Sequence, residues 1–352
     1  MRVFQGVCIG AMTTTEPAAY AAYKAGVHDG PFQADDVLCM AIVLLVHPEV
    51  TIIRTRDEQV LASCACVCDV GGAYNEDTNR YDHHQRGGAG ERPNGIPYAA
   101  CGLLWKNRLW AYDAISAVIP GRIPLHLEKV ARKVDQMLIQ SVDAIDTGHT
   151  KPNVFSFSAF IAMHNPEGDE GFDDAFMRAV GVGVTALRLA VKQAAREVEA
   201  QIKVHAALGE RAALVPNPET PFEKHVLILD EFIPWQEGVL THPGGEDIQL
   251  VVFPSADNQW LVQVVPTGLG DFTSRIKLPQ EWGALRNGEL QAASGVEDAV
   301  FCHKDLWIAG ALTRRGAMKL AAKAACMVMG CSDTCMRRPP TQDPCSCVCV
   351  PE

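Results

Sequence analysis

The chain has 352 residues, of which 48% are hydrophobic and 21% charged, a composition typical of a globular protein with about two domains. Its net charge of −11 excludes a protein that binds nucleic acid through a broad basic face, but it is compatible with a local site of carboxylates and metal ions. The longest apolar run, 37–46, is much shorter than the roughly 20 residues of a membrane-spanning helix, so we expect no membrane segment. The 13 cysteines indicate free thiols in a reducing compartment.

The N-terminal part of the chain alternates short apolar strands with helices. Strands are predicted to end near 27, 55 and 70, and the segment 34–47 has the composition of a helix. Asp35 and Asp36 lie in the first turn of that helix, where acidic residues suit the helix dipole. This alternation predicts an α/β fold with a parallel sheet. Further predicted segments are helices over 99–112 and 125–145 and a loop over 152–166.

The C-terminal part begins with long helical periodicity over 172–208, followed by the proline-rich segment 216–221. The later predicted elements are strands over 225–229, 248–253 and 260–265, a hairpin turn over 254–258 and a helix over 313–327. The sequence thus predicts a first domain, a helical connector with linker, a smaller α/β domain and a disordered tail rich in Cys and Pro. Their expected ranges are 20–165, 170–220, 221–327 and 328–352.

The most informative chemical pattern is Asp-His-His at 82–84. This short string occurs by chance, but Asp69 ends a predicted strand 13 residues earlier. His28 and Asp35 flank an earlier turn between a strand and a helix. Because ligands of parallel sheets bind outside the carboxyl ends of the strands, we expect these side chains to converge.

A further acidic pair, Asp143 and Asp146, ends a predicted helix. Carboxylates and imidazoles together are suitable ligands for Mn²⁺ or Mg²⁺. Two such ions can bind a phosphoryl group and activate a water molecule. The pattern therefore predicts a two-metal site for phosphate chemistry.

The sequence resembles the MYG-type exonucleases (melanocyte proliferating gene or GAMM family) of the DHH phosphoesterase superfamily, over about residues 25–325. The matching segments are 53–57, 69–72, 80–86, 101–105, 143–146, 234–237, 278–286 and 292–295. The resemblance implies a DHH domain and a smaller C-terminal domain with a metal cleft between them. It also implies phosphodiester hydrolysis, 3′ to 5′ on RNA, in the mitochondrial matrix or the nucleus, while the cytoplasm remains open.

The resemblance also assigns residues to the site. The implied ligands of two Mn²⁺ or Mg²⁺ ions are His28, Asp35, Asp69, Asp82, His83 and Asp146. Asp69 would bridge both ions and act in catalysis together with His84, which is also a candidate phosphate contact. Asp82 is either a ligand or a support for the ligands, and Asp143 is the alternative to Asp146.

Two positions depart from the family pattern. Gln33 stands where the family has a second histidine in the turn after His28, and Leu312 replaces a lysine that could hold phosphate. Arg314 or Arg315 is the candidate to contact phosphate in its place. Two functions therefore stay open: a hydrolase of RNA or short oligonucleotides, and an inactive relative that acts as a scaffold or binding protein in an RNA-containing assembly. A phosphatase of cyclic dinucleotides or pyrophosphate is a further enzymatic alternative.

Overall fold

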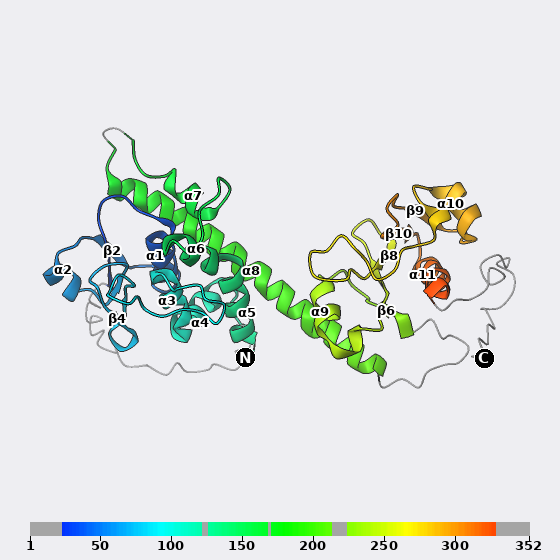
Figure 1. Ribbon diagram of the computed structural model, residues 1–352, viewed down its shortest axis with the longest axis horizontal. Coiled ribbons are helices and arrows are strands. Elements are labelled where there is room, and N and C mark those ends of the chain that lie inside the picture. The colour runs from blue at the N-terminus through cyan, green and yellow to red at the C-terminus, as the bar shows by residue number, and fades with distance from the viewer. Residues whose placement is uncertain (1–22, 122–125, 168–169, 213–223, 329–352) are drawn as a thin grey trace, which may run out of the picture. The chain divides into compact units, whose positions relative to one another are not determined.

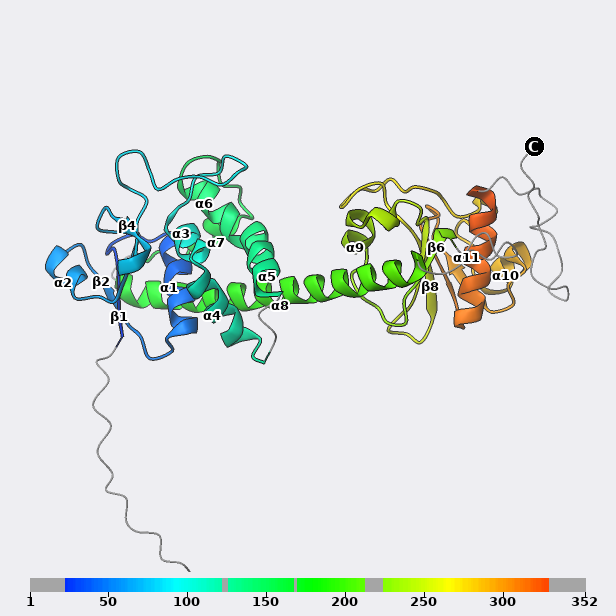
Figure 2. The same ribbon diagram turned by 90° about the horizontal axis from the view of Figure 1, so that it is seen from below.

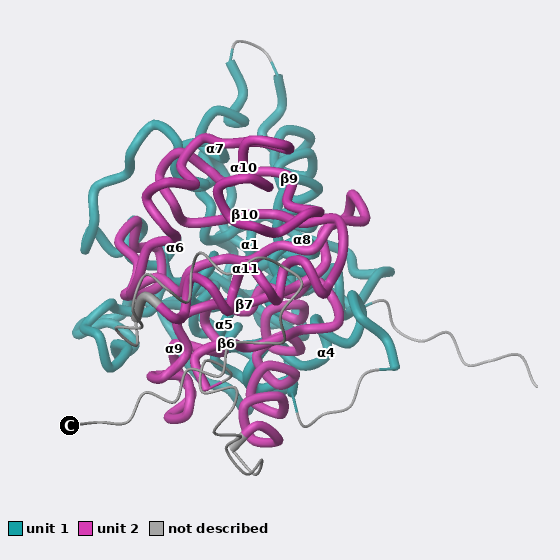
Figure 3. The backbone as a smooth tube through the Cα atoms, turned by 90° about the vertical axis from the view of Figure 1, so that its right-hand side faces the viewer, with its two compact units in different colours: residues 1–194 teal, residues 195–352 magenta. Residues whose placement is uncertain are grey.

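The computed structural model describes residues 23–121, 126–167, 170–212 and 224–328 (Figure 1). The chain forms two compact units, with the boundary after Ala194 inside helix α8 (Phe172–Ala212) (Figure 3). Each unit contains one five-stranded sheet covered by helices, which confirms the predicted α/β class. The predicted linker 216–221 and almost all of the predicted tail lie outside the described residues. No helix within the described ranges combines the length and apolar character needed to cross a membrane.

The sheet of unit 1 has the strand order β2-β1-β3-β5-β4. The strands are β1 (Lys24–Val27), β2 (Thr51–Arg54), β3 (Cys66–Cys68), β4 (Tyr74–Asn75) and β5 (Arg80–Tyr81). The first four strands in this order are parallel, whereas β4 is antiparallel to β5. The carboxyl ends of the neighbouring strands β1, β3 and β5 therefore lie side by side at one edge of the sheet.

Helix α1 (Ala34–Val46) is the central helix of unit 1. It contacts β1 and β3 and also several other helices of the unit, and nearly all its side chains are buried. Its contact with α8 is close, since a Cβ added to Gly183 would lie 3.2 Å from the Cβ of Ala41. The other helices of the unit are α2 (Glu58–Ala62), η1 (Glu76–Thr78), α3 (Ala100–Lys106), α4 (Arg108–Val118), α5 (Leu127–Val134), η3 (Asp135–Ile139), α6 (Gln140–Asp146) and α7 (Phe157–Ala162).

Three predictions of secondary structure for this unit, two helices and one loop, need correction. The helix predicted over 99–112 is two helices, because Asn107 is extended and its side chain caps α4 by accepting the N–H of Leu109. The loop predicted over 152–166 contains α7, which Ser156 caps by accepting the N–H of Ala159. The helix predicted over 125–145 contains a π-helical segment, η3, between α5 and α6.

The sheet of unit 2 has the order β6-β7-β8-β10-β9, in which only β6 and β7 pair in parallel. The strands are β6 (Val226–Ile228), β7 (Leu250–Pro254), β8 (Trp260–Val264), β9 (Ala299–Cys302) and β10 (Ile308–Ala311). The remaining helices are α9 (Gln236–Thr241), η5 (Pro243–Gly245), η6 (Gln280–Trp282), α10 (Asn287–Ser294) and α11 (Arg314–Val328).

Both faces of this second sheet are buried. Leu250 and Val252 of β7 pack with α10 and α11, whereas Val251 and Phe253 pack with α9 and the last turns of α8. Alternate residues of a strand point to opposite faces, so one apolar strand serves both cores. Figure 2 shows α9 and α11 on opposite sides of the strands. The predicted strands 225–229, 248–253 and 260–265 are confirmed, while β9 and β10 were not predicted.

Candidate metal centre

The carboxyl ends of three neighbouring strands carry the histidines and two of the aspartates of the predicted site. His28 follows β1, Asp69 follows β3, and the segment 82–84 follows β5. Asp35 and Asp36 come from the first turn of α1, and Asp146 is the last residue of α6. We call His28, Asp35, Asp36, Asp69, His83 and Asp146 the histidine–carboxylate cluster.

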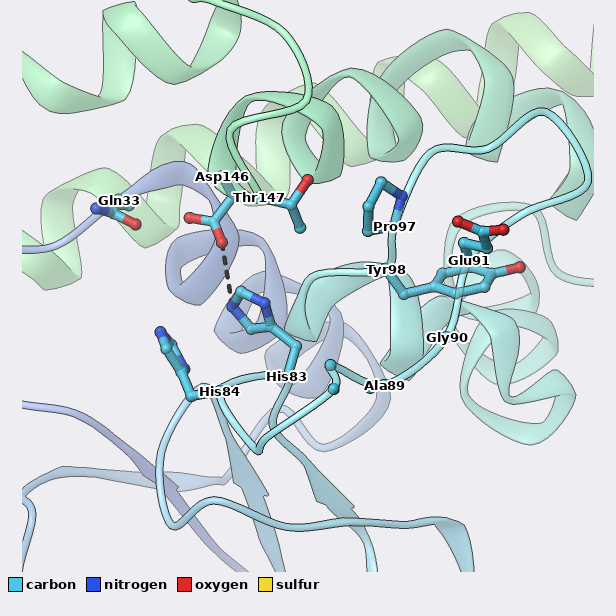
Figure 4. Close-up of a pocket in the computed structure, with 12 residues that line it drawn as sticks. Gln33, His83, His84, Ala89, Gly90, Glu91, Pro97, Tyr98, Asp146 and Thr147 are labelled. Atoms are coloured by element: carbon cyan, nitrogen blue, oxygen red, sulfur yellow. Dashed lines mark ion pairs between the residues drawn. The ribbon is translucent and has the colours of Figure 1, made fainter.

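His83 lies at the centre of this cluster. Its Nε2 is 3.1 Å from Asp146 Oδ2, 3.4 Å from Asp69 Oδ1 and 4.0 Å from Asp35 Oδ2. Figure 4 shows the imidazole pointing at the Asp146 carboxylate. One ring nitrogen thus faces three carboxylates that come from three different elements.

Asp69 lies between two imidazoles. Its Oδ2 is 3.4 Å from His28 Nε2, while its Oδ1 faces His83. The backbone of Asp69 is left-handed, with φ of 55°, a conformation that Asp and Asn adopt more readily than bulkier residues. This turn aims the carboxylate back across the strand ends. Asp69 therefore has the geometry of a residue that bridges two ligand sets.

Asp36 belongs to the cluster although its place in the sequence predicts only a role at the helix start. Its Oδ2 lies 3.1 Å from His28 Nε2, and its Oδ1 accepts the N–H groups of Gln33 and Val37. The side chain is fully buried. A carboxylate at the start of a helix can serve the helix terminus or belong to a site. The sequence pattern alone does not reveal that an imidazole faces Asp36.

Asp35 is held by the backbone of α3. Its two oxygens accept the N–H groups of Ala100 at 2.9 Å and Cys101 at 2.7 Å, at the positive end of that helix. These bonds fix the orientation of a fully buried carboxylate. The sequence motif 101–105 therefore contributes to the site through its backbone.

Asp82 holds other residues of the site in place. Its Oδ1 lies 2.8 Å from His84 Nδ1 and accepts the backbone N–H of His84, and its Oδ2 accepts the N–H of Gly72 at 2.6 Å. His84 Nδ1 is also 3.4 Å from Asp69 Oδ1. Asp82 therefore orients His84 and the turn at Gly72, and a direct bond from Asp82 to a metal stays a prediction. The ring of His84 is 62% exposed, at the mouth of the site.

Asp143 belongs to a second cluster, together with Arg92 and Asp135, which we call the arginine cluster. Arg92 Nη1 lies 2.6 Å from Asp143 Oδ2, and Arg92 Nε and Nη2 donate to the two oxygens of Asp135. Asp143 Oδ1 also accepts from the N–H of Gly102 and the Sγ–H of Cys101. A Cβ on Gly102 would lie 1.8 Å from Asp143 Oδ2, so this position requires glycine. Asp143 therefore faces a permanent cation, whereas Asp146 faces an imidazole.

The charges of the histidine–carboxylate cluster shift the pKa values of its members. Burial alone would lower the pKa of His28, but Asp36 and Asp69 outweigh it and raise this pKa to about 10. In the same way, Asp146 and Asp69 overcome burial and raise the pKa of His83 to about 11. Burial and the neighbouring carboxylates raise the pKa of Asp35 well above its usual value.

These groups fit a metal ion. Asp69 Oδ1 and His83 Nε2 are buried and make no hydrogen bond within the described part of the chain. Single ligand atoms of Asp35, His83 and Asp146 lie within 4.8 Å of one another, as do those of Asp69, His83 and His84. Oxygen and imidazole donors suit Mn²⁺ and Mg²⁺, and such an ion would supply the positive charge that this cluster needs.

A pocket of about 630 Å³ opens beside the cluster (Figure 4). His83, His84, Asp146 and Thr147 form one side of it, and Gln33 lines it as well. The rest of the lining comes from residues 87–91, 97 and 98. Gln33 is exposed, and its side chain lies on the same side of the pocket as Asp146.

The predicted phosphate contacts of the C-terminal part lie in unit 2. Arg314 forms an ion pair with Asp230 at 3.2 Å and its guanidinium lies over the ring of Trp260. Arg315 is exposed in the first turn of α11, and Leu312 is exposed just before that helix. A phosphate contact by either arginine stays a prediction.

Comparison with known proteins identifies the family. Residues 24–325 match the model of MYG1_exonuc, described as an uncharacterised protein family (UPF0160). The chain belongs to this family. It is 30% identical to the MYG1 protein of Dictyostelium discoideum over 319 residues, which cover 84% of this chain and 94% of the relative. It is 29% identical to the MYG1 exonuclease of Homo sapiens over 327 residues, which cover 85% and 84% of the two chains.

A bacterial relative is also similar: the MYG1 protein of Chlamydia trachomatis is 31% identical over 296 residues, or 80% of this chain and 90% of that protein. Among solved structures, the exonuclease RecJ bound to manganese has 16% sequence identity and a TM-score of 0.24, with 86% of this chain and 90% of that chain covered. The RecJ of Thermus thermophilus in complex with Mn²⁺ has the same TM-score and 14% identity, with 86% of this chain and 52% of that chain covered.

Proposed function

We propose that this chain is a metal-dependent phosphodiesterase that removes nucleotides from the 3′ end of RNA or short oligonucleotides. The proposed ligands of two Mn²⁺ or Mg²⁺ ions are His28, Asp35, Asp36, Asp69, His83 and Asp146. The observation that carries the proposal is the buried Nε2 of His83, which three carboxylates surround and which has no hydrogen-bond partner among the described residues. The name MYG1 exonuclease of the mammalian relatives supports the hydrolysis of nucleic acid. The proposed location is the mitochondrial matrix or the nucleus.

Two bound ions would hold the scissile phosphate and activate a water molecule between them. The chain itself orients the donors: backbone N–H groups fix Asp35, and the left-handed turn aims Asp69. Asp82 engages Nδ1 of His84, so Nε2 is the remaining ring nitrogen, and it would donate to a phosphate oxygen when the ring carries both protons. The local positive charge of loaded ions explains how a chain of net charge −11 would bind a polyanion.

A second candidate function is binding without catalysis, and one observation favours it. Gln33 is exposed at the pocket and donates its backbone N–H to Asp36, where the family pattern has an imidazole. A neutral amide is a weaker metal ligand than imidazole. The chain would then be a scaffold or binding protein in an RNA-containing assembly.

The test is metal content and Mn²⁺-dependent hydrolysis of a short RNA, measured on the wild type and on Asp69→Asn. Asparagine retains the shape and the tolerance of positive φ, so the loss of charge is isolated. We expect stepwise shortening of a 5′-labelled RNA by the wild type and a rate about a thousandfold lower in the variant.

Asp77→Asn, at an exposed position outside the cluster, is the matched control and should retain the full rate. Intact RNA with the wild type, together with substoichiometric metal, would contradict hydrolysis and support the binding function. Shortening of a 3′-labelled RNA from its 5′ end would contradict the proposed polarity.

A further inference from the structure

The side of the pocket opposite Asp146 is built by a hairpin that the proposed chemistry does not use. Residues 90–98 pair with themselves, since Tyr98 N–H donates to Gly90 O and Arg92 N–H donates to Ile96 O. Glu91 and Pro97 face each other as an isolated bridge. Both line the pocket, together with Tyr98 and the glycine-rich loop 87–90 (Figure 4).

Arg92 and Asn94 anchor this hairpin to the rest of unit 1. Arg92 is 4% exposed and is held in the arginine cluster, and its guanidinium lies 4.3 Å from the ring centre of Tyr98. At the turn, Asn94 donates to Gln140 Oε1 at 3.0 Å. Because Arg92 points into the core, its neighbour Glu91 is presented to the pocket at a defined place.

The carboxylate of Glu91 decides what this end of the pocket accepts. A carboxylate accepts hydrogen bonds and repels phosphate oxygens. Among the groups of a nucleic acid, the one that it meets must therefore be neutral and rich in donors. The cis hydroxyls of a ribose have this chemistry, and carboxylates bind ribose hydroxyls in nucleotide-binding proteins.

We infer that the pocket binds the 3′-terminal nucleoside of RNA, with the ribose 2′ and 3′ hydroxyls on Glu91; this inference rests on the proposed function. A 3′-terminal nucleotide has its scissile phosphate on the 5′ side and both ribose hydroxyls free. The cluster around His83 takes the phosphate at one end of the pocket, and Glu91 takes the diol at the other.

The remaining wall explains how any base would be accepted. Gly87, Gly88 and Gly90 have positive φ and Ala89 has only a methyl group, so the loop 87–90 presents backbone without long side chains. Pro97 adds an apolar ring. Side chains that could read the edge of a base are absent from this stretch, and the pocket volume of about 630 Å³ is ample for one nucleoside. The loop 87–90 therefore offers a base no side-chain hydrogen bond by which one base would be selected over another.

The inference is tested first by binding of neutral nucleosides, which need no metal. Adenosine and 2′-deoxyadenosine are titrated into the full-length chain and into Glu91→Gln, with ligand-observed NMR as the readout. The wild type should bind adenosine about tenfold more tightly than 2′-deoxyadenosine, because a hydrogen bond to a carboxylate is lost. Glu91→Gln should lose most of this preference, because a neutral amide oxygen accepts the hydroxyl more weakly than a carboxylate does. Glu49→Gln, at an exposed position elsewhere, should behave as the wild type.

The second arm uses RNA oligonucleotides that differ only in the last sugar, ribose or 2′-deoxyribose, and compares release of that nucleotide with Mn²⁺. Rapid release from the ribose end, with the preference lost in Glu91→Gln, supports the inference. Equal binding of the two nucleosides, or no binding of either, overturns it even if RNA is cleaved. Selective adenosine binding with intact RNA would instead overturn the proposed hydrolysis and leave the nucleoside site standing.

Discussion

The two buried polar clusters of unit 1 adjoin each other and differ in the origin of their positive charge. In the arginine cluster, one guanidinium that is always charged faces two carboxylates. In the histidine–carboxylate cluster, four carboxylates face two imidazoles, which are charged only when protonated. Cys101 joins the two, since its N–H donates to Asp35 and its Sγ–H donates to Asp143. The first cluster therefore has its positive charge within the protein, while the second takes its positive charge from solution, as protons or metal ions.

Removal of the permanent cation should have the largest effect on stability. Arg92→Met leaves the buried Asp143 and the partly exposed Asp135 without this counterion, and we expect the free energy of unfolding to fall by about 3–5 kcal/mol. Urea denaturation of the metal-free protein measures this change. The exposed Arg108, which pairs with Glu128, is the matched control, and Arg108→Met should cost about 1 kcal/mol at most. Equal values for the two variants would contradict the distinction between the clusters.

Substitutions of the two acidic residues of α6 should differ in their effect on the Mn²⁺ affinity of the protein. Asp146→Asn removes a proposed ligand and should lower Mn²⁺ affinity at least about tenfold. Asp143→Asn should leave Mn²⁺ affinity close to the wild type but lower stability, because it leaves Arg92 partly unpaired. Equilibrium dialysis with metal analysis measures the affinity. Loss of metal from Asp143→Asn with retention by Asp146→Asn would reverse the assignment.

Metal binding should displace protons. The raised pKa values of His28 and His83 keep both imidazoles protonated at pH 7 in the metal-free protein. Mn²⁺ affinity should therefore increase as the pH rises from 7 to 9, with proton release, and calorimetry in buffers of different ionisation enthalpy measures that release. The stability of the metal-free protein should change in the opposite direction. A histidine pKa that folding raises gives stability that is complete below pH 6.5 and is lost as the pH rises through about 10 to 11.

Restoration of the family histidine should have the smallest effect. Gln33→His places an imidazole at the pocket beside Asp146, and we expect Mn²⁺ affinity to rise by no more than about tenfold. Gln33→Ala is the control and should leave the affinity unchanged. A gain in hydrolysis from nothing in Gln33→His would show that the natural chain is the inactive relative. Equal hydrolysis in all three proteins would show that hydrolysis does not depend on the side chain at position 33.

Much of the metal-site fold could be predicted from sequence because short apolar runs mark the strands and their ends mark the site. The strands that precede His28 and Asp69 are such runs, and parallel pairing brings their carboxyl ends together. Strand β5, before the segment 82–84, is only Arg80–Tyr81 and was not predicted as a strand. The roles of these residues came instead from the family resemblance, and as metal ligands they remain predictions.

Other features could not be predicted because they depend on partners distant in sequence. Arg92 lies in a glycine- and proline-rich stretch that has no periodicity, and its partners Asp135 and Asp143 are far along the chain. Strands β9 and β10 were missed because they are short and pair with each other and with β8 across a strongly polar loop. Asp36 was misjudged because its role is visible only once His28 is placed beside it.

The π-helical segment η3 sets the direction in which the side chains of α6 point. A π turn contains one residue more than an α turn, so the extra residue rotates everything that follows by about 100° relative to an uninterrupted α-helix. Asp135 is in η3, whereas Asp143 and Asp146 follow it in α6. Deletion of a single residue from η3 would give a regular helix in which Asp143 and Asp146 face away from Arg92 and His83. The π turn thus directs Asp143 toward Arg92 and Asp146 toward His83 on the same helix.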